Sequence, residues 1–195
     1  EENVSPTLHL LRRATIHNDA NEWNVLVNNG EVSGLIDFGD LAYSPLINEL
    51  AVAISYACFD KENPIEWASI ILKSYHEVLA LEENEIAVLY YLIAARLCTS
   101  LCNAAHSKKT YPENEYAFGS EKQAWNLLHR WISINPIAAE NSFRSAIGLS
   151  ALSVKSTNEM VEERLEVLSP ALTLTYSKPI VLSRSAFQYM YDVYG

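Results

Sequence analysis

The feature that most constrains the fold is a series of apolar residues at helical spacing that begins at Leu46. Leu46, Leu50 and Ile54 fall on one face of a first helix, because residues three or four apart share a helix face. Asn63 is a favourable N-cap for the next helix, and Pro64 follows it at the first helical position. The same spacing predicts further helices over residues 63–78, 83–101, 120–132 and 137–147.

A β-hairpin is predicted before these helices. Residues 25–27 and 32–36 are strand-like and flank the dipeptide Asn29-Gly30, which readily adopts the positive φ angles of a tight turn. The second strand leads directly into Asp37. The expected fold class is therefore α+β, mostly helical, with one small hairpin.

The two ends of the chain differ from its middle. Residues 7–13 are expected to form the last turn of a helix, because the basic pair Arg12 and Arg13 suits a helix C-terminus. Since that helix would begin earlier, we expect the chain to be cut from a longer protein. After Gly148 the composition shifts to Ser, Thr, Glu and Val, and a short charged helix is expected over residues 158–168. A domain boundary is therefore expected at this shift.

The composition indicates a globular chain with an acidic surface. Of 195 residues, 49% are hydrophobic, which excludes intrinsic disorder, and 14 Lys+Arg against 24 Asp+Glu give a formal net charge of −10. An acidic chain favours neither nucleic acid nor an anionic membrane as a partner, and a small cationic molecule suits it better. The apolar stretch 86–101 is interrupted by Arg96, Thr99 and Ser100, so no membrane span is expected.

The cysteines indicate a reducing compartment. Cys58, Cys98 and Cys102 are odd in number and lie in apolar helical contexts. The N-terminus shows no secretory signal pattern, so a cytoplasmic location is expected. Cys98 and Cys102 are four residues apart and could share a metal, but without a second ligand pair we expect them to be small buried hydrophobic residues.

Three oxygen-bearing side chains are expected to converge at one end of the hairpin. Asp19 and Asn24 flank a polar loop before the first strand, and the second strand returns Asp37 to the same end. Mg²⁺ prefers carboxylate, amide, water and phosphate oxygens. Phosphoryl transfer also needs a carboxylate that receives or orients the acceptor proton. The pattern therefore predicts Asp19 as the catalytic base and Asn24 and Asp37 as ligands of Mg²⁺ bound with ATP.

Two sequence patterns carry a family resemblance. His-x-Asp-x-x-x-x-Asn at 17–24 and Ile-Asp-Phe-Gly-Asp at 36–40 resemble the catalytic and metal-binding motifs of the aminoglycoside phosphotransferase and choline kinase superfamily, which has the protein-kinase-like fold. The resemblance covers about residues 7–148. It implies the kinase-like C-terminal lobe, with a small β-hairpin carrying the catalytic loop and the N-terminal lobe absent. The implied site residues are the base Asp19, the metal ligands Asn24 and Asp37, and His17 as support for the catalytic loop.

The chain departs from the family pattern in two respects. Many members have Gly after the loop His and a second His two residues after the Asp, where this chain has Asn18 and Asn21. No Gly-rich, nucleotide-covering loop is found among only six glycines. We therefore expect this chain alone to bind ATP poorly or not at all and to be inactive, and its substrate-binding residues stay unknown.

A second resemblance concerns the C-terminal part. Leu-Ser-Pro-Ala-Leu-Thr-Leu-Thr-Tyr-Ser-Lys-Pro-Ile-Val-Leu-Ser-Arg at 168–184 and Phe-Gln-Tyr-Met-Tyr-Asp at 187–192 resemble the opening segment of class III aminotransferases, which use pyridoxal phosphate. Bacterial fusion proteins place a kinase-like domain before such an aminotransferase, and pyridoxal phosphate would bind only in the downstream domain. The implied division is a phosphotransferase lobe over 1–148, a linker with a short helix over 149–168, and the start of an aminotransferase-like domain over 169–195.

Other side chains have two interpretations. Trp23 is expected to pack under the catalytic loop, and its alternative place is the edge of the substrate cleft. Asp40 is either an acid close to the metal ligands or a turn residue. Three acids suit helix starts but could also line a cleft for an ammonium group: Glu113, Glu115 and Glu121. The helical tryptophans are expected in the core: Trp67, Trp125 and Trp131.

Two classes of function follow. The first is a small-molecule kinase domain that transfers the ATP γ-phosphoryl group to a hydroxyl of an amine-bearing substrate, such as an amino alcohol, within a fusion with an aminotransferase. The second is a non-catalytic, kinase-like scaffold or regulatory domain of that aminotransferase. The expected partners are a small cationic substrate and the fused domain, and a homo-oligomer is an open alternative.

Overall fold

The computed structural model describes residues 3–113, 119–152, 157–167, 180, 182–186 and 189–192. The helices are α1 (Ile47–Ala57), α2 (Pro64–Val78), α3 (Glu83–Thr110), α4 (Glu121–Ile132), α5 (Pro136–Ala146) and α6 (Thr157–Val167). The strands form three antiparallel two-stranded sheets among the described residues. These are β1 (Arg13–Ile16) with β4 (Ala42–Pro45), β2 (Val25–Asn28) with β3 (Glu31–Leu35), and β5 (Leu182–Ala186) with β6 (Tyr189–Asp192). Short 3₁₀ helices are η1 (Leu8–Leu10), η2 (Glu22–Asn24) and η3 (Phe38–Asp40).

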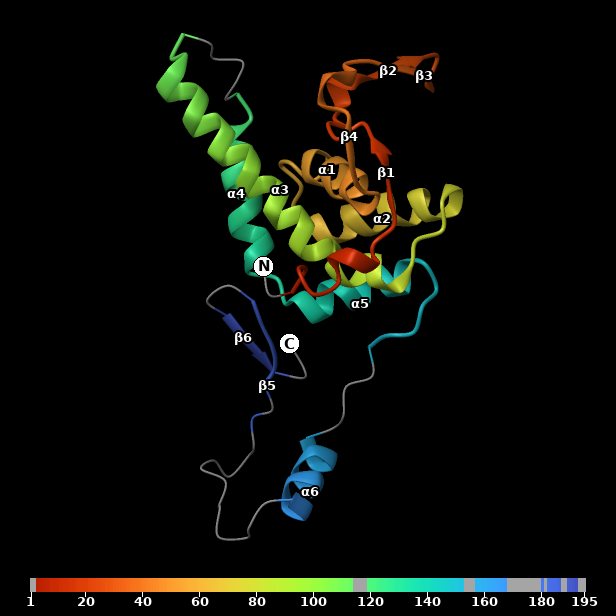
Figure 1. Cartoon of the computed structure of the whole chain (residues 1–195), viewed down its shortest axis with the longest axis vertical. Helices are drawn as coiled ribbons and strands as arrows, with labels where there is room; N and C mark the ends of the chain where they lie inside the picture. Colours follow the sequence, from red (N-terminus) through yellow and green to blue (C-terminus); the bar gives the residue numbers. More distant parts are fainter. Residues whose placement is uncertain are drawn as a thin grey trace.

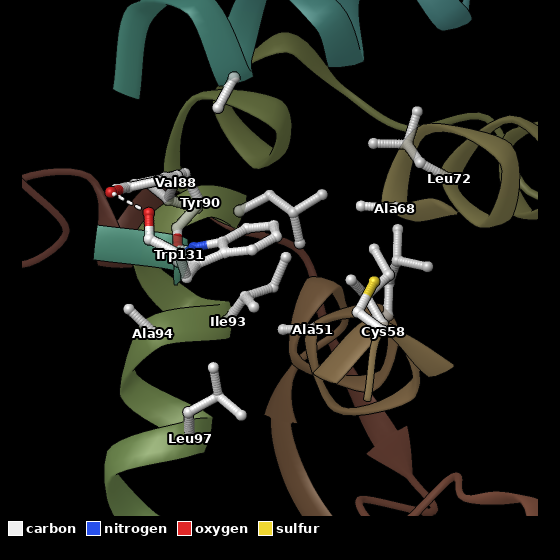
Figure 2. Packing of buried hydrophobic residues seen from close by; sticks show 14 of the residues in the cluster. Ala51, Cys58, Ala68, Leu72, Val88, Tyr90, Ile93, Ala94, Leu97 and Trp131 are labelled. Carbon is white, nitrogen blue, oxygen red and sulfur yellow. Dashed lines mark hydrogen bonds between the residues drawn. The ribbon is translucent and has the colours of Figure 1, made fainter. Parts of the chain in front are cut away.

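The five helices α1 to α5 surround one apolar core. Helix α3 packs against α1, α4 and α5, and α2 packs against α1 and α5 (Figure 1). Figure 2 shows part of this core, in which the buried ring of Trp131 stacks on Tyr90 with ring centroids 5.6 Å apart. Trp131 Nε1 donates to the Tyr90 carbonyl at 3.0 Å, and the Tyr90 hydroxyl donates to the Trp131 carbonyl at 3.1 Å. These bonds satisfy the polar atoms of both side chains, so the aromatic pair joins α3 and α4 without an unpaired donor.

Local sequence explains where the helices begin. Asn63 Oδ1 accepts the Glu66 N–H at 3.4 Å, and Asn135 Oδ1 accepts the Ile137 N–H at 2.8 Å. Each of these Asn caps is followed by Pro, which suits the first helical position. The helices predicted from Leu46 to residue 147, the charged helix near 158–168 and the central hairpin are confirmed, and the fold is mostly helical with small two-stranded sheets. Helix α3 differs in length, because it continues to Thr110 rather than ending at Leu101.

The prediction of a helix end over residues 7–13 is wrong. Only the single turn η1 forms there, and Arg13 already belongs to β1. Arg12 reaches the first turn of α3, where it donates to both carboxylate oxygens of the buried Glu85 at 3.0 and 2.6 Å. This long-range ion pair and the pairing of β1 with β4 hold the segment extended, and neither is visible in the local pattern.

The cysteine prediction is wrong for two of the three residues. Cys58 is buried, and burial raises the pKa of its thiol to about 12, so it stays protonated and unreactive. Cys98 and Cys102 are exposed on α3. The C-terminal end of α3 projects past the other helices (Figure 1). Among the described residues, no neighbouring helix therefore covers the side of α3 that carries these two cysteines, although its sequence is apolar.

The prediction that all helical tryptophans lie in the core is correct only for Trp131. Trp67 and Trp125 are each more than two fifths exposed. Helical spacing places a residue on a face, but the packing of neighbouring helices decides whether that face is covered.

Helix α3 differs from the expectation that no segment could span a membrane. By length and composition alone it is long and apolar enough to cross one. Half of its most apolar 18-residue window is buried inside the protein. Its buried residues, among them Ile86, Ile93 and Leu97, belong to the apolar core.

The C-terminal part contains α6 and the β5–β6 hairpin, which Figure 1 shows apart from α1 to α5. The sequence of this part is strand-like at residues 173–176 and 189–191. Residues 189–191 form most of β6, as that pattern predicts, and residues 173–176 lie outside the described residues.

Candidate active site

The polar loop between β1 and β2 is anchored to the strand that precedes Asp37. His17 follows the end of β1, and its Nε2 lies 2.8 Å from the carbonyl oxygen of Ile36. The N–H of Ile36 donates to the carbonyl of Asn24 at 3.0 Å. Asp37 is the next residue in the chain, so these two bonds bring it to the loop that carries Asn24. The expected meeting of the loop and the strand end is therefore observed.

Both carboxylate oxygens of Asp19 are held by side-chain donors. Oδ1 accepts from the Tyr56 hydroxyl at 3.2 Å and from Arg96 Nη2 at 3.1 Å. Oδ2 accepts from the side-chain amides of Asn21 and Asn24, each at 3.0 Å. The carboxylate is thus oriented by the loop on one side and by α1 and α3 on the other. Its direction is set before any ligand enters, as a general base requires.

Asn24 and Asp37 offer the oxygens expected of magnesium ligands. The Asn24 amide nitrogen donates to Asp19, and no hydrogen bond from the described residues reaches its Oδ1. The Asp37 carboxylate is exposed and likewise receives none within the described ranges. An amide oxygen and a carboxylate fit Mg²⁺, which completes its coordination with water and phosphate oxygens. The described part of the chain holds no cluster of three His, Cys, Asp or Glu side chains suited to a metal.

Two non-glycine residues of the site have left-handed backbone angles. The φ angle is 65° at Asn18 and 61° at Asp37, and Asn and Asp tolerate this region better than other non-glycine residues. The N–H of Asn18 donates to Glu49 Oε2 on α1 at 2.9 Å. Asn18 therefore keeps the backbone conformation that Gly would give, and this departure from the family pattern leaves the loop intact.

This conformation leads to a prediction for Asn18. Asn18→Gly is expected to change the free energy of unfolding by less than about 0.5 kcal/mol, whereas Asn18→Val lowers it by about 1 to 2 kcal/mol, because a β-branched residue is strained at positive φ. Urea unfolding of both variants measures the difference. An equal loss in both variants would contradict the prediction and assign the effect to the Asn side chain.

A cleft of about 490 Å³ opens beside Asp19. Its walls are Asp19, Asn21, Glu22, Trp23, Tyr56, Phe59, Gly119, Ser120 and Gln123. Tyr56 and Phe59 meet edge to face, with ring centroids 5.6 Å apart. Trp23 is 75% exposed, so the prediction that it packs under the loop is wrong, and it lies at the cleft edge instead.

The acids that were expected near helix starts do not form this cleft. Glu121 is in an ion pair with Lys108, Glu113 is exposed, and neither lines the cavity beside Asp19. Glu115 lies outside the described residues. Asp40 ends η3 with an exposed side chain. The acid that joins Asp19 in this cleft is Glu22, which sequence reasoning did not single out.

Sequence reasoning also missed Tyr56 and Arg96. Burial raises the pKa of Tyr56, and the nearby Arg96 cation partly opposes this shift. The phenol therefore stays protonated and donates to Asp19. The available signal for Arg96 was its position as the one charged residue within the apolar stretch 86–101.

The family comparison covers this region. Residues 3–86 match the model of the phosphotransferase enzyme family. The phosphotransferase-family segment contains the loop, the central hairpin, α1 and α2. Arg96 lies beyond its matched range.

Relatives of the chain are kinases by name. Hydroxylysine kinase from Mus musculus is 34% identical over 150 residues, which cover 72% of this chain and 40% of that protein. Hydroxylysine kinase from Danio rerio is 33% identical over 117 residues, or 57% of this chain and 33% of that protein. Homoserine kinase from Gluconobacter oxydans (strain 621H) is 38% identical over 81 residues, or 40% of this chain and 26% of that protein. The chain thus spans two fifths or less of the length of these relatives.

Proposed function

We propose that the full-length protein transfers the γ-phosphoryl group of ATP to a hydroxyl of a small, amine-bearing acceptor. The observation that carries the proposal is the fixed carboxylate of Asp19 on the wall of a cleft, hydrogen-bonded to Asn24. The backbone of Asn24 is bonded in turn to Ile36, the residue before Asp37. The match to the phosphotransferase enzyme family supports it, as do the hydroxylysine and homoserine kinases among the relatives. In this proposal residues 1–148 correspond to the C-terminal lobe of a kinase-like fold.

The proposed roles follow from the chemistry of phosphoryl transfer. The acceptor oxygen bonds to the γ-phosphorus, the bond to the β-phosphate oxygen breaks, and the hydroxyl proton goes to Asp19. Asn24 Oδ1 and the Asp37 carboxylate would hold Mg²⁺, which neutralises charge on the phosphates when it is bound. His17 supports the loop through its contact with the Ile36 carbonyl.

The acceptor is proposed to be an ammonium-bearing hydroxy compound of the hydroxylysine or homoserine type. Glu22 and Asp19 place two carboxyl groups in the cleft, and Tyr56 and Phe59 present ring surfaces there. Carboxylates attract an ammonium group, and aromatic faces add cation–π attraction. The net charge of −10 favours the approach of such a molecule.

Acceptor-dependent ADP formation by the full-length protein tests this function. The panel contains hydroxylysine, homoserine, their decarboxylated amino alcohols, choline and an aminoglycoside, each assayed with Mg-ATP and again with excess EDTA. We expect turnover with at least one hydroxy amine and none with EDTA, because the phosphates of ATP need the cation. If no compound of the panel stimulates ADP formation, the proposal is contradicted.

One observation favours a second function. Each oxygen of Asp19 already accepts two hydrogen bonds, an arrangement that also suits a non-catalytic scaffold. In that case the domain would regulate a fused partner, and the panel would give no turnover.

The C-terminal division stays a proposal of its own. We infer a linker over 149–168 and the start of a class III aminotransferase-like domain over 169–195, with a cytoplasmic location for the fusion. Pyridoxal phosphate absorbance in the full-length protein, lost on borohydride treatment, would support it. Absence of that absorbance would contradict it without affecting the kinase proposal.

A further inference from the structure

We propose that Arg96 is a positioning residue for phosphoryl transfer, acting through Asp19 and Tyr56. The inference rests on the proposed function. Arg96 Nη2 lies 3.1 Å from Asp19 Oδ1 and 3.1 Å from the Tyr56 hydroxyl, which itself donates to Oδ1 at 3.2 Å. The guanidinium carbon also lies 5.6 Å from the centre of the Tyr56 ring. The three side chains form a closed triangle, so a shift of any one of them lengthens two contacts.

Fold stability alone does not account for an arginine at this position. Arg96 interrupts the apolar stretch 86–101 of α3, and its side chain is only 20% exposed. Its Nε is buried and has no hydrogen-bond partner among the described residues. An unsatisfied buried donor destabilises a fold, and a partly exposed ion pair stabilises it only weakly. A group that is retained at such a cost commonly serves a site.

The triangle connects the base to the helical core. Asn21 and Asn24 belong to the same loop as Asp19, so they move with it. Among the described residues, the contacts that link the carboxylate to α1 and α3 come from Tyr56 and Arg96. Tyr56 also lines the cleft, so an acceptor hydroxyl can replace its bond to Oδ1 while Arg96 continues to hold that oxygen. Reacting groups must meet within about 3 to 3.5 Å, and a misplacement of about 1 Å costs roughly 10²-fold in rate.

Steady-state kinetics of the full-length protein test this role. Arg96→Met is expected to lower kcat by about 10²-fold while the KM for Mg-ATP changes by less than about threefold. Arg96→Lys should lose about tenfold, because an ammonium keeps the charge but lacks the planar fork. The matched control is Arg130→Met on α4, whose exposed guanidinium donates to the Lys61 carbonyl. This control should keep kcat within about twofold.

A double-mutant comparison separates positioning from a general structural role. The second measurement uses the Asp19→Asn variant as the background, with radiolabelled ATP to detect its slow turnover. There Arg96→Met should lower kcat by less than about threefold more, because Arg96 acts through the carboxylate that is already lost. An unchanged kcat in Arg96→Met, or a full 10²-fold loss on top of Asp19→Asn, would overturn the inference. If circular dichroism shows that Arg96→Met is unfolded, the test rests on Arg96→Lys. A tenfold lower kcat of Arg96→Lys at an unchanged melting temperature supports the role, and an unchanged kcat overturns it. Failure of the unmutated protein to turn over any acceptor is a separate result that removes the proposed function and this inference together.

Discussion

Replacing Asp19 with Asn in the full-length protein is expected to lower kcat by about 10²- to 10⁴-fold, the usual contribution of a general base. The Asn side chain keeps the shape of Asp but cannot take the acceptor proton. Its amide nitrogen would also face donors, because Asn21, Asn24, Tyr56 and Arg96 all donate to Asp19 now. Acceptor-dependent ADP formation measures the loss, and circular dichroism confirms that the variant is folded.

Asp60→Asn is the matched control for this prediction. Asp60 has a positive φ angle, which Asn also tolerates, and its carboxylate accepts from Gln123, which an Asn oxygen can do as well. We expect its kcat to stay within about twofold of the unmutated protein. A kcat of Asp19→Asn that matches the control would show that Asp19 is not the base, and it would favour the scaffold function.

The largest stability effect is expected from Trp131→Ala, which should lower the free energy of unfolding of the 195-residue chain by about 3 to 5 kcal/mol. Trp131 is fully buried at the contact of α3 and α4, where it stacks on Tyr90. Its loss leaves a cavity, removes the aromatic stacking and removes the indole N–H that donates to the Tyr90 carbonyl. Urea unfolding followed by circular dichroism at 222 nm measures the change, since this signal does not depend on the deleted indole.

Trp125→Ala on the same helix is the control for Trp131. Trp125 is 46% exposed and stacks on His129 at the surface of α4, so its loss opens no internal cavity. We expect its free energy of unfolding to fall by less than about 1 kcal/mol. An equal loss of unfolding free energy in both variants would show that burial of Trp131 against Tyr90 is not the source of the effect.

Local patterns predicted much of the fold. Apolar spacing located α1 to α5, the Asn63-Pro64 pair marked the start of α2, and Asn29-Gly30 marked the central hairpin. Each signal acts within a few residues of where it is read. The strand β4 was missed because it is short and its apolar residues do not alternate, and its partner β1 lies far away in the chain.

The candidate site was predicted in part for the same reason. Asp19 and Asn24 share a short loop, and the hairpin returns the chain to that loop at Ile36, as the hydrogen bonds of Asn24 and Ile36 show. Their catalytic and metal roles stay predictions. Glu22 went unnoticed because an acid in a polar loop carries no distinctive local signal.

The sequence by itself determined where helices α1 to α5 and the central hairpin form, and which oxygen-bearing side chains stand at the hairpin end. Only the tertiary structure decided that Tyr56 and Arg96, 37 and 77 residues from Asp19, hold its carboxylate. It also decided that Trp23 and the two cysteines of α3 are exposed. The physical reason is that backbone propensity and turn chemistry are local, whereas burial and long-range ion pairs depend on which helices pack together.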